Sequence, residues 1–575
     1  MPDHREQVDR RLTLCLYSMS LLFLMLLFSL YFFQVFKTDK YVELASENRL
    51  RILRLPADRG EIFDRNGVPL ALDVHSFSIM GYPLDIRTHD LIPQVKDVFV
   101  SHGLPLSELQ IEKSINEQFL VPYRAVTLVS DLTLSQMTDI ISDPRFPKQL
   151  FPMQVSRRTY PAGAMVSHIL GYVSEINQKE LVDTEGNYRG GDIIGKDGVE
   201  KAYEQVLKGS PGKQVLEVDA RGRKVQTLEF NPPLPGNDLD LTIDLGAQML
   251  VARHFENFKG AAVAVDVTNG DVLVLYSSPA YDNNPMARGI SPEEWRLLSV
   301  NRDRPLMNRA ISGLYPPGSV FKPVVALAAL EEKTADTRTS YYCNGSFTLG
   351  NRKFRCWKKY GHGNVNMISA IKDSCDVYFY QVGLKTGIDV LSDWATSFGI
   401  GEKTGINLTG EKAGSIIDRK WKRKNIGEKW YPGDTVNYSI GQGFLLMTPL
   451  QIVRMYAALA NGGRMLVPRL VRNEEDSRKI EITDSNLEII CKALERVVED
   501  GTATYAGEFG VSISGKTGTC QNPHGLDHAL FAGYAPVKDP RYAVAIILEA
   551  GEHGGSVASP VGGELLAYLV KHGSN

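Results

Sequence analysis

The chain has 575 residues, of which 43 % are hydrophobic and 23 % are charged. That length exceeds one ordinary domain, and the balance is typical of a globular protein rather than a disordered one. With 64 basic and 67 acidic residues the formal net charge is −3, which excludes the strong basic excess typical of nucleic-acid-binding proteins. Six cysteines are too few for a disulfide-dense scaffold.

Residues 12–36 form an uncharged run of 25 residues that is rich in Leu, Phe and Met. As a helix, this run exceeds the roughly 30 Å hydrocarbon core of a membrane. It is too long for a signal-peptide core and has no small-x-small cleavage site, so we expect an uncleaved transmembrane helix rather than a buried core helix. Basic residues flank it on both sides: Arg5, Arg10 and Arg11 before, Lys37 and Lys40 after. The second pair weakens the asymmetry without reversing it, and we expect residues 1–11 in the cytoplasm and everything after residue 36 outside it.

The rest of the chain divides in composition near residue 240. Residues 37–240 mix short strands, polar helices and turns, and a Pro-rich connector at 232–237 is the candidate boundary. Residues 241–571 contain stronger signals, which in chain order are a β-hairpin at 261–277, a helix at 319–331, strands at 530–535 and 542–549, and a helix at 565–571. Helices placed between early and late strands predict an α+β or mixed α/β domain.

A pattern of Ser and Lys three residues apart occurs at Ser319 and Lys322, just after a Pro-Pro-Gly sequence. Positions i and i+3 share a helix face, so the amine can reach the hydroxyl and act as the base that a serine nucleophile needs. A helix start also offers N–H groups to an oxyanion. The pattern alone is weak, because residues 210–213 and 369–372 match it too.

The tripeptide Lys-Thr-Gly occurs three times, at Lys385, Lys403 and Lys516. The last copy also completes a formal phosphate-binding loop, G-x-x-x-x-G-K-T, at residues 510–517. That loop needs a helix starting at its Lys, and residues 518–525 cannot form one. We therefore reject nucleotide binding and expect the Lys516 copy to lie on a strand.

The order of the motifs chooses among these matches. Serine-lysine acyl-transfer enzymes, including penicillin-binding proteins and β-lactamases, carry S-x-x-K, then S-x-N or S-D-N, then K-T-G along the chain. Here Ser319 and Lys322 are followed by Ser374-Cys375-Asp376 and then by Lys516-Thr517-Gly518-Thr519.

Five segments together resemble class B penicillin-binding proteins, and within that class the elongation-type (penicillin-binding protein 2) branch. The segments are residues 59–67, 315–322, 433–443, 448–451 and 516–519. Two features favour that branch over the division type: Asp376 in the middle motif, and residues 357–363 upstream of it. The resemblance implies a single transmembrane helix (12–36), a non-catalytic α+β pedestal (37–240), and a transpeptidase domain (241–571) with a central antiparallel sheet flanked by helices.

The resemblance also implies a peptidoglycan D,D-transpeptidase that β-lactams acylate. Ser319 would attack the D-Ala-D-Ala carbonyl, Lys322 would act as general base, and Ser374 would relay a proton to the leaving amine. The third motif would hold the substrate carboxylate and the catalytic network through Lys516, Thr517, Gly518 and Thr519, with backbone N–H groups of Ser319 and Thr519 forming the oxyanion hole. The middle motif usually ends in Asn; Asp376 can only accept hydrogen bonds when ionised, so it fits the role of a substrate ligand less well than Ser374 does.

The implied setting is the inner membrane, with the bulk of the chain periplasmic or otherwise extracytoplasmic. The substrates would be peptidoglycan stem peptides, and the pedestal would contact a polytopic glycan polymerase of the elongation machinery. Two rival functions remain on the same fold. One is a hydrolase, either a D,D-carboxypeptidase or a β-lactamase, and the other is a non-catalytic scaffold or β-lactam sensor.

A possible metal site lies between the first two motifs. Cys343, Cys356, His362 and Cys375 are spaced C-x12-C-x5-H-x12-C, and three cysteines with one histidine form a structural zinc set. Some elongation-type relatives are expected to bind zinc at the equivalent positions. The alternatives are a Cys343–Cys356 disulfide or unlinked buried thiols. The acyl-transfer chemistry itself requires no cofactor.

Overall fold

The computed structural model describes residues 3–38, 50–104, 106–117, 125–184, 188–218, 224–472, 476–522 and 525–573. The chain divides into two compact units, Met1–Asp58 with Lys208–Gly236 and Arg59–Leu207 with Asn237–Asn575. The division after Gly236 falls in the predicted Pro-rich connector. Most of the residues expected to form a pedestal therefore belong to the same compact unit as the C-terminal half of the chain.

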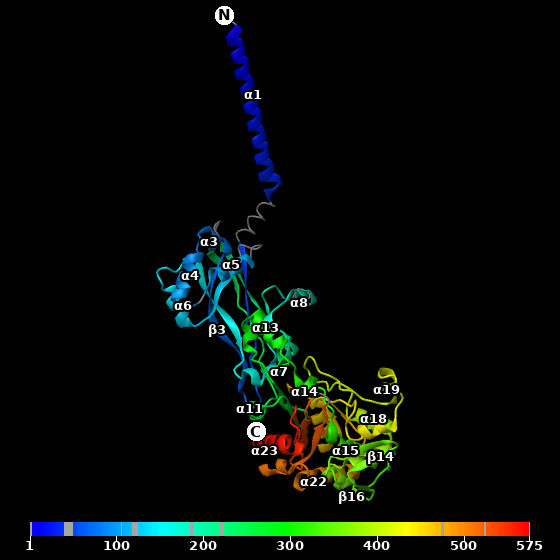
Figure 1. The fold of residues 1–575 in the computed structure, drawn as a ribbon. Helices are drawn as coiled ribbons and strands as arrows, with labels where there is room; N and C mark the ends of the chain where they lie inside the picture. The colour runs from blue at the N-terminus through cyan, green and yellow to red at the C-terminus, as the bar shows by residue number, and fades with distance from the viewer. Residues whose placement is uncertain are drawn as a thin grey trace. The chain divides into compact units, whose positions relative to one another are not determined.

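The first unit contains the predicted apolar helix. Helix α1 (Asp3–Tyr31) continues directly into the π-helix η1 (Phe32–Phe36), drawn in blue in Figure 1. The stretch Val8–Phe36 has a mean hydropathy of 2.1 and is entirely exposed, so by length and composition it is able to cross a membrane. Lys40, which entered the charge comparison, lies outside the described residues.

The first unit also contains an antiparallel three-stranded sheet. Its order is β1 (Leu50–Leu55), β8 (Gly212–Val218) and β9 (Lys224–Asn231). Strand β1 pairs with β8 from Leu50 opposite Glu217 to Leu55 opposite Gly212. A strand that begins at Leu50 is thus paired with strands more than 150 residues later in the chain.

The second unit begins with a sheet built around one long strand. The order is β10 (Leu239–Asp240), β2 (Ile62–Phe63), β3 (Pro69–Gly81) and β4 (Val126–Leu132), and β5 (Leu150–Thr159) also pairs with β3. All pairs are antiparallel except β10 with β2. A turn that contains Asn66 and Gly67 separates β2 from β3.

Four helices pack on this sheet: α3 (Pro83–Thr88), α4 (Ile92–Ser101), α5 (Glu108–Glu117) and α6 (Leu134–Ile141). They share a small apolar core that includes Ile79, Ile86, Phe99, Ile111 and Ile140, all fully buried. This core is separate from the main one, which fills the C-terminal half of the chain.

A buried ion cluster joins the start of this region to its later helices. Arg59 donates to Glu200 at 2.5 Å and to Glu204 at 2.6 Å, while Arg158 donates to Glu200 at 2.7 Å and to Asp73 at 3.2 Å. Burial alone would raise the pKa of Glu200, but Arg158 and Arg59 hold it below its ordinary value. Since every charge has an opposite neighbour, the cluster meets the requirement for burying ions.

The C-terminal half is built on a five-stranded antiparallel sheet, as predicted. The order is β12 (Val272–Ser278), β11 (Gly260–Asp266), β21 (Tyr542–Leu548), β20 (His528–Ala535) and β19 (Ser514–Cys520). The first and last strands in sequence therefore meet at the centre, with Gly260 opposite Leu548. Nearly all of these residues are buried, so both faces of the sheet are covered.

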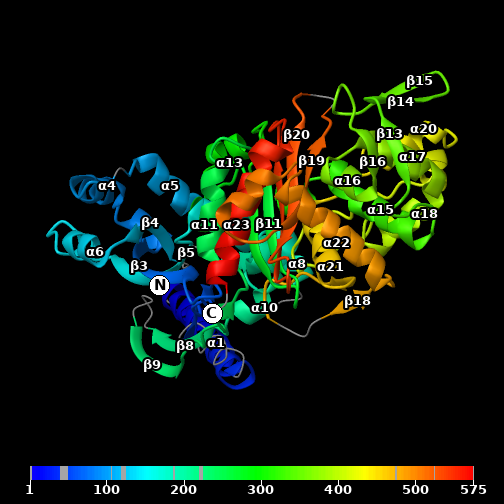
Figure 2. The ribbon, with the colours of Figure 1, turned by 90° about the horizontal axis from the view of Figure 1, so that it is seen from below.

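Helices cover the sheet. Helices α11 (Leu245–His254) and α23 (Ser559–His572) contact each other and the sheet, and α21 (Pro449–Ala460) packs across β11, β21 and β20. Figure 2 shows α11 and α23 side by side along the strands. The predicted hairpin at 261–277, the C-terminal strands and the final helix are all confirmed.

The remaining elements are short helices and short paired strands that complete the fold. The helical segments are η2 (Gly163–Met165), α7 (Ser167–Leu170), α8 (Gln178–Asp183), α9 (Gly198–Ala202), α10 (Glu204–Leu207), α12 (Asn284–Arg288), α13 (Pro292–Ser299), α14 (Arg309–Ser312), η3 (Gly318–Phe321), α15 (Lys322–Glu331), α16 (Met367–Lys372), α17 (Asp376–Thr386), α18 (Ile388–Ser397), α19 (Arg419–Asn425), α20 (Pro432–Tyr438), α22 (Asp484–Glu499), η4 (Thr504–Phe509) and η5 (Gly554–Ala558). The short strands form pairs: β6 (Val173–Glu175) with β7 (Ile193–Gly195), β13 (Ser340–Cys343) with β16 (Gly363–Asn366), β14 (Ser346–Leu349) with β15 (Arg352–Arg355), and β17 (Arg464–Leu466) with β18 (Ser477–Lys479).

Candidate active site

Ser319 lies in the 3-10 turn η3, and the α-helix α15 begins only at Lys322. The helix predicted to start at residue 319 is therefore shifted by three residues. Pro323 explains the shift, because it has no N–H to donate to the carbonyl of Ser319 in an α-helical bond. The turn leaves the Ser319 side chain partly exposed, while Val320 and Phe321 are buried.

Gly318 allows the Ser319 turn to lie directly against strand β19. Its φ is +55°, and a Cβ atom there would lie 2.7 Å from the carbonyl oxygen of Thr519. Its N–H donates to the carbonyl of Gly441 at 2.8 Å, another glycine with positive φ. A side chain at either glycine would push the nucleophile away from the third motif.

Lys322 is completely buried and joins the first motif to the second. Its Nζ atom is within hydrogen-bond distance of the backbone oxygen of Ser374 at 2.9 Å, the Ser374 hydroxyl at 3.2 Å and Asp376 Oδ1 at 2.7 Å. The spacing predicted a Lys322 amine within reach of Ser319, but its three hydrogen bonds all go to the middle motif. Ser374 is thus in direct contact with the buried amine of the first motif.

The middle motif occupies the turn between α16 and α17. Ser374 has a φ of +55°, and Asp376 is the first residue of α17. The Asp376 carboxylate accepts from Lys322 on one oxygen and from the backbone N–H of Trp357, 3.0 Å away, on the other. Both partners are donors, so an Asn here would turn its own N–H group toward one of them. The departure from Asn is therefore matched by the donors around it.

The third motif lies on β19, where Lys516, Thr517 and Gly518 are buried and Thr519 is exposed. Lys516 Nζ donates to the Thr517 carbonyl at 3.1 Å. Burial, and then the positive charge of nearby Lys322, lower the pKa of Lys516 well below its ordinary value. The strand continues through Cys520, so no helix starts at the Lys as a phosphate-binding loop requires.

The other two Lys-Thr-Gly copies have different surroundings from Lys516. Lys385 lies in the last turn of helix α17, and Lys403 lies in a loop. Of the three copies, the one at Lys516 lies on a strand, as we expected from the sequence.

Three contacting residues were not predicted. Thr502 forms a hydrogen bond with the Thr517 hydroxyl at 2.7 Å, Gln442 Nε2 donates to the Thr519 carbonyl at 3.0 Å, and Trp357 supports the middle motif. Gln442 lies within residues 433–443, which carried the family resemblance, so that signal was available. Thr502 has no motif of its own.

The cysteine and histidine cluster forms beside the middle motif, as the spacing predicted. Cys343 ends β13, Cys356 follows β15, His362 precedes β16, and Cys375 is the residue before α17. Their ligand atoms all lie within 4.8 Å of one another, and His362 Nδ1 is 3.7 Å from the Cys343 sulfur and 3.6 Å from the Cys356 sulfur. All three cysteines are free thiols, so the alternative of a disulfide is not the state of this structure.

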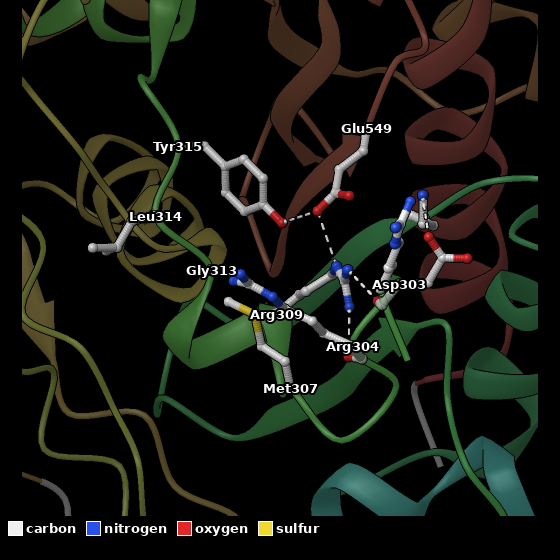
Figure 3. Close-up of a pocket in the computed structure, with 10 residues that line it drawn as sticks. Asp303, Arg304, Met307, Arg309, Gly313, Leu314, Tyr315 and Glu549 are labelled. Atoms are coloured by element: carbon white, nitrogen blue, oxygen red, sulfur yellow. Dashed lines mark hydrogen bonds and ion pairs between the residues drawn. The ribbon is translucent and has the colours of Figure 1, made fainter. Parts of the chain in front are cut away.

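A separate polar cavity of about 290 Å³ lies beside the segment that leads to Ser319. In Figure 3, Tyr315 and Arg309 both point at the carboxylate of Glu549, to which they donate at 2.8 Å and 2.9 Å. Arg309 also donates to the backbone oxygens of Asp303 and Arg304. Burial, followed by the charge of Glu549, raises the pKa of Tyr315 well above its ordinary value, so its hydroxyl stays protonated. These contacts anchor the approach to the nucleophile.

Two family models match the chain. The "Penicillin binding protein transpeptidase domain" model matches residues 260–567, and the "Penicillin-binding Protein dimerisation domain" model matches residues 54–241. Among curated relatives, the chain is 35 % identical to "Peptidoglycan D,D-transpeptidase MrdA" of Acinetobacter baumannii, over 92 % of this chain and 82 % of that one.

Solved structures agree with these matches. The structure of a complex between penicillin-binding protein PBP2 and MreC from Helicobacter pylori aligns with a TM-score of 0.80 and 32 % identity, covering 92 % of this chain and 100 % of that one. A structure described as "Structural coordination of polymerization and crosslinking by a peptidoglycan synthase complex" aligns with a TM-score of 0.75 and 29 % identity, covering 98 % and 99 %. The chain therefore belongs to the penicillin-binding proteins, in the PBP2 branch of peptidoglycan D,D-transpeptidases.

Proposed function

We propose that the chain cross-links peptidoglycan stem peptides through an acyl-enzyme on Ser319, during cell elongation and shape maintenance. The observation that supports this most is the convergence of three distant motifs. The Ser319 turn lies against β19, and Lys322 reaches from the same segment to Ser374 and Asp376. A nucleophile, a buried amine and a carboxylate-binding strand thus meet in one place.

In the first half of the reaction, Ser319 Oγ attacks the carbonyl carbon of the penultimate D-Ala. Lys322 accepts the hydroxyl proton, and the N–H groups of Ser319 and Thr519 stabilise the oxyanion. The C–N bond then breaks, an ester forms on Ser319, and Ser374 passes a proton to the amine of the departing D-Ala. The 3.2 Å contact between Lys322 Nζ and Ser374 Oγ supports this relay.

In the second half, the amine of another stem peptide attacks the ester carbonyl. The ester bond breaks, a new amide links the two peptides, and a proton lost by the attacking amine passes to Ser319 Oγ. Lys516, Thr517, Gly518 and Thr519 hold the terminal carboxylate of the donor peptide along β19. A β-lactam carries a carboxylate and a reactive amide in the same arrangement, so it would acylate Ser319 and remain bound.

The rival functions differ in the fate of the acyl-enzyme. A carboxypeptidase or β-lactamase transfers the acyl group to water, and a sensor retains it without turnover. The test is incubation with a donor pentapeptide and a labelled amine acceptor, with the products separated by mass. A labelled cross-linked product that has lost only the terminal D-Ala supports the proposal. Hydrolysed tetrapeptide alone, or an acyl-enzyme that never turns over, contradicts it.

The proposal includes location and partners. The apolar helix would anchor the chain once in the inner membrane, with residues 1–11 in the cytoplasm and the remainder periplasmic. The excess of arginine before residue 12 supports that orientation. The proposed partner is a polytopic glycan polymerase, supported by the fold shared with a chain of a peptidoglycan synthase complex.

We further propose that Cys343, Cys356, His362 and Cys375 hold a structural zinc ion. Three sulfurs and an imidazole nitrogen within 4.8 Å of one another fit a tetrahedral zinc set. Hydrogen bonds from the thiol of Cys375 and from His362 lower the pKa of Cys356, which favours the thiolate that binds metal. The ion would fix the hairpins that carry Cys343 and Cys356 to the start of α17, and it would take no part in the acyl transfer.

Metal analysis of the purified protein tests the zinc proposal. We expect one zinc per chain in the wild type and in Cys491→Ser, whose cysteine lies outside the cluster, and a loss of zinc in Cys356→Ser. A metal-free wild type with unchanged stability would contradict the proposal.

A further inference from the structure

Trp357 combines a largely exposed side chain with hydrogen bonds directed into the protein. It follows Cys356 directly, and 61 % of the residue is exposed. Its indole N–H nevertheless lies 3.1 Å from the backbone oxygens of both Asp373 and Ser374. Its backbone N–H donates to Asp376 Oδ2 at 3.0 Å. Both N–H groups of this one residue therefore end on the middle motif.

Two groups that accept from Trp357, the Ser374 carbonyl and the Asp376 carboxylate, also accept from Lys322. The Ser374 oxygen accepts from Lys322 Nζ at 2.9 Å and from the indole at 3.1 Å. The Asp376 carboxylate accepts from Lys322 on Oδ1 and from Trp357 on Oδ2. The Ser374 carbonyl and the Asp376 carboxylate thus position the Lys322 amine, and Trp357 donates to the same two groups.

The turn that Trp357 holds is strained. Ser374 has a φ of +55°, a left-handed conformation that is unfavourable for a residue with a Cβ atom and persists only when its surroundings enforce it. Donors on both sides of its carbonyl supply that enforcement. Without the indole N–H, the turn would have a lower barrier to relaxing, and the Ser374 hydroxyl would move relative to Lys322.

We propose that Trp357 is a positioning residue for acyl transfer, whose two N–H groups keep the turn from Asp373 to Asp376 in the geometry that aligns Ser374 with Lys322. This inference rests on the proposed function of Ser319. Trp357 does not touch the reacting atoms in this account, and it acts through the middle motif. Its ring also contacts His362 edge-on at 5.5 Å, so the ring and the N–H need separate tests.

The test replaces the indole N–H while keeping the ring. One variant is Trp357→Phe, and a second introduces benzothienyl-alanine at position 357, which changes only the N–H to sulfur. The matched control is Trp421→Phe, because Trp421 likewise packs on an aromatic ring, that of Phe444 at 5.6 Å, but is remote from the three motifs in sequence. Acylation by a fluorescent penicillin is followed at increasing concentration, which separates the rate constant at saturation from the half-saturating concentration.

We expect the acylation rate constant at saturating penicillin to fall about three- to tenfold in both position-357 variants, as the loss of one hydrogen bond predicts. The half-saturating penicillin concentration should change little. The control should acylate as the wild type does. Unchanged rate constants in both variants would overturn the proposal. A change confined to half-saturation would also overturn it, since the ring would then only contact the ligand.

Hydrogen exchange distinguishes failure of this inference from failure of the proposed function. A wild type that forms no Ser319-dependent adduct would sink the proposed function. Amide exchange across residues 373–378 still reports on the turn in that case. Faster exchange in the benzothienyl-alanine variant than in the wild type supports the positioning role, and equal exchange contradicts it.

Discussion

The hydroxyl group of Thr502 lies 2.7 Å from that of Thr517, the central residue of the Lys-Thr-Gly strand. Thr502 comes from the loop before η4, and its hydroxyl fixes the direction of the Thr517 hydroxyl, which would bind the substrate carboxylate. The substitution Thr502→Val keeps the shape of the side chain and removes this contact. We therefore expect slower acylation with little change in fold.

The magnitude follows from the single bond that is lost. A hydrogen bond between uncharged groups contributes about 0.5–1.5 kcal/mol, and 1.4 kcal/mol corresponds to about tenfold in rate. If the whole contribution is made in the transition state, the second-order rate constant for acylation by penicillin should fall about 2- to 12-fold. Stopped-flow fluorescence with a labelled penicillin measures that constant directly.

Thr334→Val is a matched control, because Thr334 and Thr386 form another threonine pair, also 2.7 Å apart and partly buried. This control should lose a similar amount of stability and keep its acylation rate. The reasoning is refuted if Thr502→Val acylates as fast as the wild type. It is also refuted if the two variants are slowed equally, since the effect would then be a general loss of stability.

Three further substitutions test the turn that carries the nucleophile and two buried ionisable groups. Gly318→Ala places a Cβ atom 2.7 Å from a carbonyl oxygen of β19 and should slow acylation at least tenfold. The control is Gly289→Ala, at a φ of +88° with no atom within 4 Å of the added Cβ. This control should lose only about 1 kcal/mol of stability and keep its acylation rate. Glu200→Gln leaves two buried arginines without full charge compensation and should lower the free energy of unfolding by about 3–5 kcal/mol in denaturant titrations. Glu564→Gln, in a partly exposed pair with His254, should lower it by less than about 1 kcal/mol. Burial lowers the pKa of His168 from 6.5 to about 4, so the unfolded chain takes up a proton that the folded chain does not, and stability falls as the pH drops through this range. His168→Gln should therefore remove about 2–3 kcal/mol of the stability lost between pH 7 and 4.5, and an identical pH dependence in variant and wild type would contradict this assignment.

The sheet of the catalytic half was predictable because its strands are continuous apolar segments bounded by turn residues. The hairpin at 260–278 and the strands β20 and β21 follow that rule, whereas β19 was recognised from its Lys-Thr-Gly motif. The order of three short motifs was also enough to choose Lys516 over two identical tripeptides. Each of these signals is local in sequence, so one chain is sufficient to detect it.

The partners of Lys322 could not be predicted from the spacing of S-x-x-K. That spacing brings the amine to Ser319 only if an α-helix begins at the serine, and Pro323 delays the helix. Trp357 lies within residues 357–363, which supported the branch, but that signal did not show its contact with Asp376, 19 residues away. Thr502 was missed because a single hydrogen bond to Thr517, 15 residues away, leaves no pattern in the sequence.

The buried ion cluster was equally invisible. Arg59 and Glu200 are 141 residues apart, and a charged residue in a sequence is ordinarily read as exposed. Only the pairing of β3 with β5 and the packing of α9 and α10 bring the five charged residues of this cluster together. Residues 59–67 carried the family resemblance, but the reason that Arg59 matters in this fold is its burial with Glu200 and Glu204.

The central claim is that Ser319 is the nucleophile, and the site of covalent attachment of penicillin tests it most directly. The purified full chain is incubated with penicillin, its intact mass is measured, and the modified peptide is identified after proteolysis. The account predicts one adduct per chain on the peptide that contains Ser319, and no adduct in a Ser319→Ala variant that unfolds at the wild-type temperature. An adduct on any other serine, or one that persists in Ser319→Ala, would contradict the account.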